Sequence, residues 1–195
     1  GRIDTLAPAL LNSLGLAVAA SLLATGIVLL MVVLNDKRQR PLLRLAIYAP
    51  LLVPQVSLVL GLQAVLVWFW LDGTWLAMLW IHALFICPFA YLIIAPAAAA
   101  MDRRYIAVAA SLGAGPGSRY LRVALPMLAP AVTTALFVGV SVSVALYLPS
   151  LFAGGGRITT VTLEAVALAS GGSRQMAGVA AVSYTHLTLP TIPTV

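Results

Sequence analysis

Charged residues are scarce in this sequence. Only 8% of its 195 residues are Asp, Glu, Lys or Arg, whereas about a quarter of the residues are charged in an average soluble domain. Hydrophobic residues make up 62%, and four uncharged runs (residues 5–35, 45–71, 73–101 and 123–156) each exceed the roughly 20 residues that cross a bilayer. This composition excludes a soluble globular domain. It predicts an all-α, polytopic membrane helical bundle with about four complete spans and a truncated fifth.

Residues that could carry chemistry are also few. A single cysteine, Cys87, excludes a disulfide within the chain and supports no metal site. The sequence contains no paired carboxylates, no nucleophile placed beside a base, and no Asp or Glu inside a predicted span. The phosphate-binding loop Gly-x-x-x-x-Gly-Lys followed by Ser or Thr is also absent. We therefore expect no enzymatic activity, no ATP hydrolysis by this chain, and no bound cofactor or metal.

The positive charges are concentrated in two stretches between predicted spans. These stretches hold eight of the eleven Lys and Arg residues: Lys37, Arg38, Arg40, Arg44, Arg103, Arg104, Arg119 and Arg122. The remaining three are Arg2, Arg157 and Arg174. Because loops rich in Lys and Arg stay on the cytoplasmic side of a membrane, both stretches are predicted to be cytoplasmic, with the N-terminus of the chain outside. This distribution accounts for the net charge of +6 without a nucleic-acid partner.

Four spans are predicted at residues 6–34, 45–71, 75–100 and 129–151. In the first, Gly15, Ala19 and Ala20 are small enough for close helix contact. The second contains Pro50 and Pro54, which are expected to kink it near its cytoplasmic end. Leu148-Pro149-Ser150 is expected to end the fourth span.

Polar residues inside the spans have two interpretations each. Gln55 could form a hydrogen bond between helices or contact a substrate, and His82 could be a satisfied packing residue or a proton relay. Ala135, Gly139 and Ser143 form a stripe of small residues that favours helix packing, although Ser143 and Tyr147 could also line a pathway. The four tryptophans predict an aromatic belt at the outer interface: Trp68, Trp70, Trp75 and Trp80.

The stretch from residue 101 to 130 is the long segment least suited to hydrocarbon. Asp102 is placed to cap a helix over residues 103–112, and the turn from Gly113 to Gly117 must end it, because two of its glycines can take positive φ. Ser118 is expected to cap a second short helix that Pro126 then bends. The sequence therefore predicts a basic helical hairpin on the cytoplasmic surface, or, more simply, a basic loop that only sets topology.

This hairpin resembles the EAA loop of binding-protein-dependent ABC importer permeases. That motif is Glu-Ala-Ala, three residues, Gly, nine residues, an aliphatic residue, one residue and Leu-Pro. Gly113, Val123, Leu125 and Pro126 stand at the required spacings, and Ala107-Val108-Ala109 occupy the positions of Glu-Ala-Ala. The glutamate, which in the family contacts the ATPase subunit, is replaced by Ala107.

The resemblance implies a MetI-like permease core, at residues 1–182, in the bacterial inner membrane. It implies a dimer of ATPase subunits that docks on the hairpin, a second permease half and an external substrate-binding protein as partners. Residues 153–175 are similar to the outer loop of permeases for thiamine, ferric iron and polyamines, and are expected to contain a short interfacial helix over residues 162–169. There, Arg157, Glu164 and Arg174 could touch the binding protein or be ordinary solvated charges.

Two other functions are compatible with the composition. An ion-coupled secondary transporter would need ionisable groups or broken helices near the middle of the membrane, and a membrane scaffold would need polar residues only for packing. At the end of the chain, residues 183–195 resemble translated sequencing-adaptor sequence and are expected to be a non-native tail.

Overall fold

The computed structural model describes residues 3–34, 41–170, 182 and 185. Every regular element in this part of the chain is a helix, as the composition predicts. The elements are, in order, α1 (Ile3–Leu34), α2 (Pro41–Leu52), α3 (Gln55–Trp68), α4 (Trp75–Ala100), α5 (Arg104–Ser111), α6 (Pro116–Arg119), the π-helical turn η1 (Tyr120–Ala124), α7 (Leu125–Ala145), α8 (Tyr147–Gly154) and α9 (Val161–Ser170). The proposed fifth span and most of the proposed tail lie outside the described residues.

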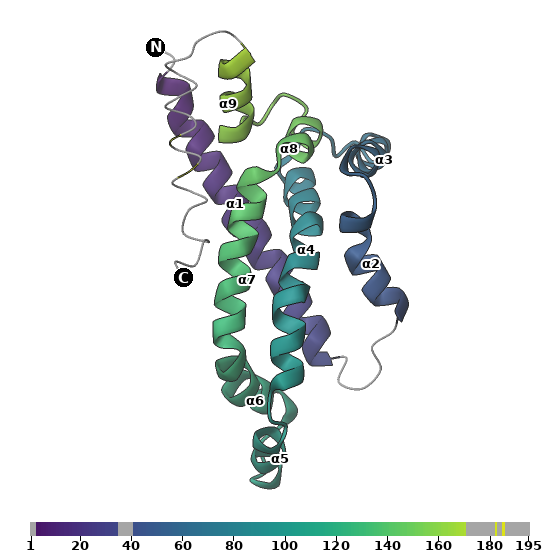
Figure 1. The fold of residues 1–195 in the computed structure, drawn as a ribbon, viewed down its shortest axis with the longest axis vertical. Coiled ribbons are helices and arrows are strands. Elements are labelled where there is room, and N and C mark those ends of the chain that lie inside the picture. The colour runs from purple at the N-terminus through teal and green to yellow at the C-terminus, as the bar shows by residue number, and fades with distance from the viewer. Residues whose placement is uncertain (1–2, 35–40, 171–181, 183–184, 186–195) are drawn as a thin grey trace.

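Helices α1, α4 and α7 pack against one another and form the centre of the molecule (Figure 1). In the part of the chain that the structure describes, three helical segments are long and apolar enough to cross a membrane: Ala7–Val32, Trp75–Ala100 and Pro116–Ala145. Their shared interior contains Val28 of α1, Ile94 of α4 and Ala135 of α7, all buried. These three spans confirm three of the four that the sequence predicts.

The second predicted span is wrong as a single helix. It is divided into α2 and α3, whose axes meet at 109°. Pro50 is accommodated inside α2, but the chain leaves the helix before Pro54. The reason is steric, because a proline ring disfavours helical backbone at the preceding residue, here Val53, and has no N–H to donate. Pro54 therefore produces a sharp elbow where the sequence predicts a kinked span.

The stripe of small residues on α7 packs as predicted. Ala135, Gly139 and Ser143 are all buried. Gly139 faces α1 and α4, where the Ser21 hydroxyl donates a hydrogen bond to the Leu136 carbonyl at 2.8 Å. On α1 the expectation was only partly right. Ala20 is buried, but Gly15 and Ala19 are exposed.

The outer end of α7 differs from the prediction. The helix ends at Ala145, before the expected Pro149, because Leu146 adopts extended backbone with ψ 94°. Pro149 lies inside the next helix, α8, near its beginning, where a missing N–H costs little. Helix α9 confirms the short helix expected near residues 162–169. Its first amide, that of Val161, donates to the Ser13 hydroxyl of α1 at 2.8 Å.

Candidate functional site

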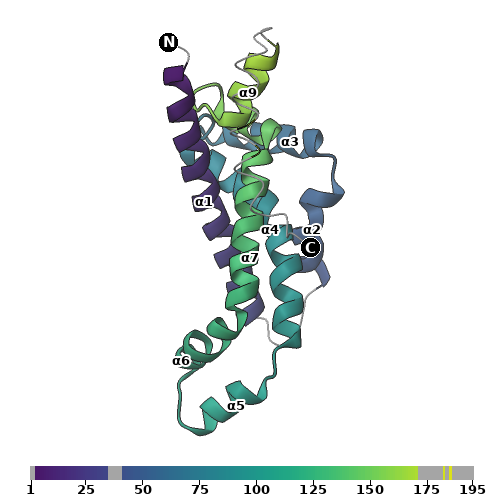
Figure 2. The ribbon, with the colours of Figure 1, turned by 60° about the vertical axis from the view of Figure 1, so that its left-hand side comes forward.

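The helical hairpin formed by α5, α6 and η1 projects from one end of the bundle (Figure 2). Its first arm follows α4, and its second arm continues directly into α7. The Arg104 amide donates to the Asp102 carboxylate at 2.9 Å, so Asp102 satisfies one of the free amides at the start of α5, as its position predicts. Because its first arm follows α4 and its second arm continues into α7, the hairpin is joined to two of the three central spans.

The turn of the hairpin is a Schellman motif centred on Gly113. The amide of Gly113 donates to the Ala110 carbonyl and the amide of Ala114 to the Ala109 carbonyl, each at 3.0 Å. Gly113 has a φ of +81°, a conformation that glycine adopts without strain. Of the glycines in this turn only Gly113 has positive φ, which corrects the expectation of two.

The second arm starts earlier than the predicted Ser118 cap. Gly115 is the N-cap of α6 and Pro116 its first residue, a position where proline needs no amide hydrogen bond. The helix then passes through η1, in which the Leu125 amide donates to the carbonyl of Tyr120, five residues back. This wider turn directly precedes Pro126, whose ring would otherwise clash with the carbonyl four residues earlier. Pro126 therefore lies in the first turn of α7, inside a helical segment that runs from Pro116 to Ala145.

The residues that match the motif fall into two groups. Ala107 and Val108 are exposed on α5, Ala109 is half-buried, and Gly113 forms the turn. Val123 and Leu125 are half-buried at the junction with α7, with Pro126 exposed beside them. The first group lies on the accessible arm, whereas the second group shapes the connection between the hairpin and the span.

The hairpin also presents apolar side chains that we did not single out from the sequence. Tyr105, Val108 and Leu112 are 59%, 56% and 82% exposed on α5, and Leu121 is 67% exposed on η1. The first three recur at helical spacing, so that they share one face of α5. This spacing is a signal by which the sequence could have revealed the face.

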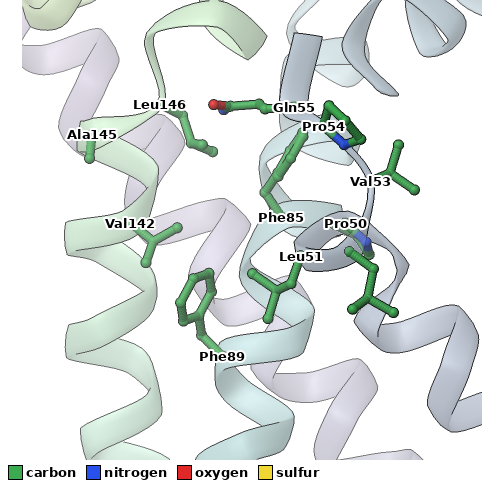
Figure 3. A pocket seen from close by; sticks show the side chains of 11 residues that line it. Pro50, Leu51, Val53, Pro54, Gln55, Phe85, Phe89, Val142, Ala145 and Leu146 are labelled. Atoms are coloured by element: carbon green, nitrogen blue, oxygen red, sulfur yellow. The ribbon is translucent and has the colours of Figure 1, made fainter. Parts of the chain in front are cut away.

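A separate pocket of about 590 Å³ lies beside the α2–α3 elbow (Figure 3). Pro50 and Pro54 line it from the elbow, Phe85 and Phe89 from α4, and Val142 from α7. Gln55 reaches into the pocket from the start of α3, and its amide is the polar group among mostly apolar neighbours. The structure thus places Gln55 at a pocket and not in a hydrogen bond between described helices.

The other two candidate pathway residues lie elsewhere. Ser143 is buried, and its hydroxyl lies 2.7 Å from Nδ1 of His82. Tyr147 begins α8 and is half-buried. Of the three candidates only Gln55 lines the pocket.

His82 is held by two serines in a fully buried position on α4. Its Nε2 lies 3.1 Å from the Ser150 hydroxyl, which itself donates to the Leu146 carbonyl at 2.6 Å. Because that donation uses the only hydroxyl proton of Ser150, the neutral tautomer that satisfies all three groups donates from Nε2 to Ser150 and accepts at Nδ1 from Ser143. This directed chain ties α4 to both sides of the break between α7 and α8. It confirms the prediction of a satisfied packing histidine.

Comparison of the whole sequence with known proteins shows the family of this chain. The family described as "Binding-protein-dependent transport system inner membrane component" matches residues 17–189. The chain belongs to this family. It is also 36% identical over 184 residues to "Inner membrane ABC transporter permease protein YnjC" of Escherichia coli (strain K12). That match covers 94% of this chain but 35% of the relative, so the chain spans about a third of the relative's length.

Membership of the binding-protein-dependent transport family confirms the resemblance drawn from the hairpin, together with the all-helical membrane fold. It also favours a permease over the secondary transporter and the scaffold. The family description and the relative's name specify no solute, so the thiamine, iron and polyamine branch stays a prediction.

Proposed function

We infer that this chain is the membrane-spanning permease part of an ATP-driven solute importer, and that the α5–η1 hairpin receives force from a separate ATPase subunit. The observation that supports this proposal is that the hairpin is continuous with two central helices. The hairpin follows α4 directly and runs without interruption into α7, and α4 and α7 pack against each other and against α1. A partner that moves the hairpin would therefore move two central spans.

The surface of the hairpin suits a protein partner. Tyr105, Val108 and Leu112 form an exposed apolar face that could fill a cleft. Ala107 on the same helix is exposed and small, so a neighbouring surface could approach the helix closely there. The matching family supports an ATPase in this role, because its members serve binding-protein-dependent transport. In this arrangement ATP is hydrolysed on the partner and not on this chain.

The distribution of side chains supports one orientation in the membrane. Arg103, Arg104, Arg119 and Arg122 lie at the hairpin end, whereas the tryptophans lie near the opposite end, where α1 also begins (Figure 1). By the positive-inside rule the hairpin faces the cytoplasm and the N-terminal end of α1 faces outside. Helix α9, on the outer side, is then available to a substrate-binding protein, with Arg157 shortly before it and Glu164 in its first turn. A second permease half would complete the pathway.

The test is co-purification of the ATPase subunit with the permease from the native host. Leu112→Glu places a charge in the apolar face of α5 and should reduce the amount of ATPase recovered at least tenfold. Ala110→Glu is the matched control, because it adds the same charge to an exposed position on the opposite flank of α5. Equal recovery of the ATPase with both variants and with the unmodified protein would contradict docking on this face.

A further inference from the structure

We propose that α3 lies in the plane of the membrane near its outer surface, and that lipid acyl chains cover its exposed face. This proposal concerns how the chain sits in the bilayer. Its assignment to the outer surface rests on the orientation proposed above, whereas the in-plane position of α3 does not depend on the proposed function. The 109° elbow turns α3 across the direction of α2. Both views of the molecule show α3 crosswise to the bundle of α1, α4 and α7, level with the beginning of α4 (Figures 1 and 2).

The two sides of α3 have different surroundings. One side packs on the protein, with Val59 fully buried and Leu58, Leu62 and Leu66 against the same core cluster. The opposite side is open and almost entirely apolar. Its large side chains are between 49% and 81% exposed: Val56, Leu60, Val65, Val67 and Trp68.

An aqueous environment does not fit this open side. Helix α3 contains no charged residue, and a helix that rests on a protein surface in water carries polar residues on its outer side. A helix apolar on all sides belongs in the interior of a protein or in hydrocarbon. The occupant of the open side must therefore be apolar.

The aromatic residues at the end of α3 favour lipid as that occupant. Trp68 and Trp70 are 81% and 90% exposed, and the short connection to α4 leads to Trp75 and Trp80, which are also exposed. Indole rings concentrate at the boundary between headgroups and acyl chains, because they are apolar with one polar N–H. Helix α3 ends among these tryptophans and runs crosswise to the spans, so its whole length lies at about the same depth in the bilayer.

The backbone of Trp70 is a second, independent observation. Trp70 has a φ of +57°, and it occupies the position of a Schellman motif where glycine is favoured. The amides of Trp70 and Leu71 donate to the carbonyls of Val67 and Leu66 at 3.0 and 2.9 Å. A bulky residue in this conformation is strained. Because its side chain is almost free of contacts within the chain, the strain is explained if the indole binds the membrane interface.

The experiment is depth measurement by spin labelling of the full chain in lipid nanodiscs. In a Cys87→Ala background, single cysteines replace four exposed residues of α3: Ser57, Leu60, Ala64 and Trp68. Matched controls replace exposed residues along the spanning helix α4: Leu76, Leu92 and Ala99. Depth is read from the ratio of relaxation by oxygen, which enters lipid, to relaxation by a water-soluble nickel complex.

If α3 lies in the plane, its labels are accessible to oxygen and show no steady change of depth along the helix, whereas the α4 labels cross the bilayer. A steady change of about 16 Å from residue 57 to residue 68, at 1.5 Å per residue, would mean that α3 continues a span and would overturn the proposal. Protection from both reagents would indicate a protein neighbour, such as a second permease half, and would overturn it too. Access of the nickel complex to labels along the whole open face of α3 would show that this face lies in water, and would also overturn the proposal.

A second measurement uses native side chains in case a cysteine variant is poorly folded. With Trp75 and Trp80 replaced by phenylalanine, the fluorescence of Trp68 and Trp70 should be quenched most by lipids brominated near the headgroup. Strongest quenching by bromine near the end of the acyl chain, or no quenching at any depth, would contradict the proposal.

Discussion

Gly139 of α7 lies against Ser21 of α1 so closely that a Cβ atom at position 139 would be 2.4 Å from the Ser21 hydroxyl oxygen. The same Cβ would be 2.9 Å from Ile86 Cγ2 of α4. The three central helices therefore meet at a point where even one methyl group has no space. Their spacing is set by this contact.

Gly139→Ala should destabilise the bundle by about 1–3 kcal/mol, because the added methyl group either separates the helices or displaces the Ser21 hydroxyl from Leu136. Thermal unfolding in detergent measures the change. Gly15→Ala on α1 is the control, since that glycine is exposed with open space around it, and stability should be unchanged or raised. Ser21→Ala should recover part of the loss when combined with Gly139→Ala. Equal melting temperatures for Gly139→Ala and Gly15→Ala would refute the close contact.

The buried serines of α7 offer a paired comparison. Ser143→Ala removes the donor to Nδ1 of His82 and leaves a buried nitrogen without a partner, which should cost about 1–3 kcal/mol in the free energy of unfolding. Ser141, two residues earlier, has a buried hydroxyl that makes no hydrogen bond to the described residues. Ser141→Ala should therefore be neutral or stabilising in the same unfolding assay. A similar loss for both variants would show that the His82 chain contributes nothing.

The Gly113 turn can be tested separately from docking. Gly113→Ala forces a side chain into positive φ, which should cost about 1 kcal/mol locally and change the angle between the two arms of the hairpin. Transport per ATP hydrolysed, measured in proteoliposomes with the partner subunits, should fall, while insertion into the membrane is unchanged. Gly117→Ala is the control, because Gly117 has negative φ and open space around it. Normal coupling in Gly113→Ala would exclude a need for this turn geometry.

Trp70→Gly should have opposite effects on stability and on membrane contact. The substitution removes positive-φ strain, so the free energy of unfolding in detergent should rise by about 1 kcal/mol. It also removes an interfacial indole, so the end of α3 should become more accessible to water-soluble reagents in nanodiscs. Trp80→Gly, on the regular helix α4, should only destabilise. A loss of stability in detergent for Trp70→Gly as well would contradict the strain at this residue.

The sequence was sufficient to predict features with short-range causes. The hairpin follows from Asp102, Gly113 and Pro116, each of which acts on its own backbone. The stripe through Gly139 follows from spacing on one helix. These predictions are confirmed because neighbouring residues determine them.

Features that depend on contacts between distant segments were missed. Helix α1 has apolar residues on every side, so its sequence does not indicate which side is buried, and Gly15 and Ala19, predicted to allow close helix contact, are exposed in the described part of the chain. The partners of His82 lie on α7 and α8 and become neighbours only because the chain breaks at Leu146. The elbow at Pro54 is sharper than the predicted kink, because two prolines alone do not distinguish a kinked span from two helices. The second arm begins at Gly115 and not at the predicted Ser118 cap, because Pro116 is favoured as the first helical residue.

The uninterrupted helix from Pro116 to Ala145 has a mechanical consequence. Within it, α7 has 21 residues, so at 1.5 Å per residue it is about 32 Å long, with its foot at the hairpin and its head beside the Leu146 break. A tilt of about 5° at the foot of α7 would displace its head by about 3 Å, less than one helical turn. Amplification by leverage would let a small rotation at one membrane surface reposition α8 at the other.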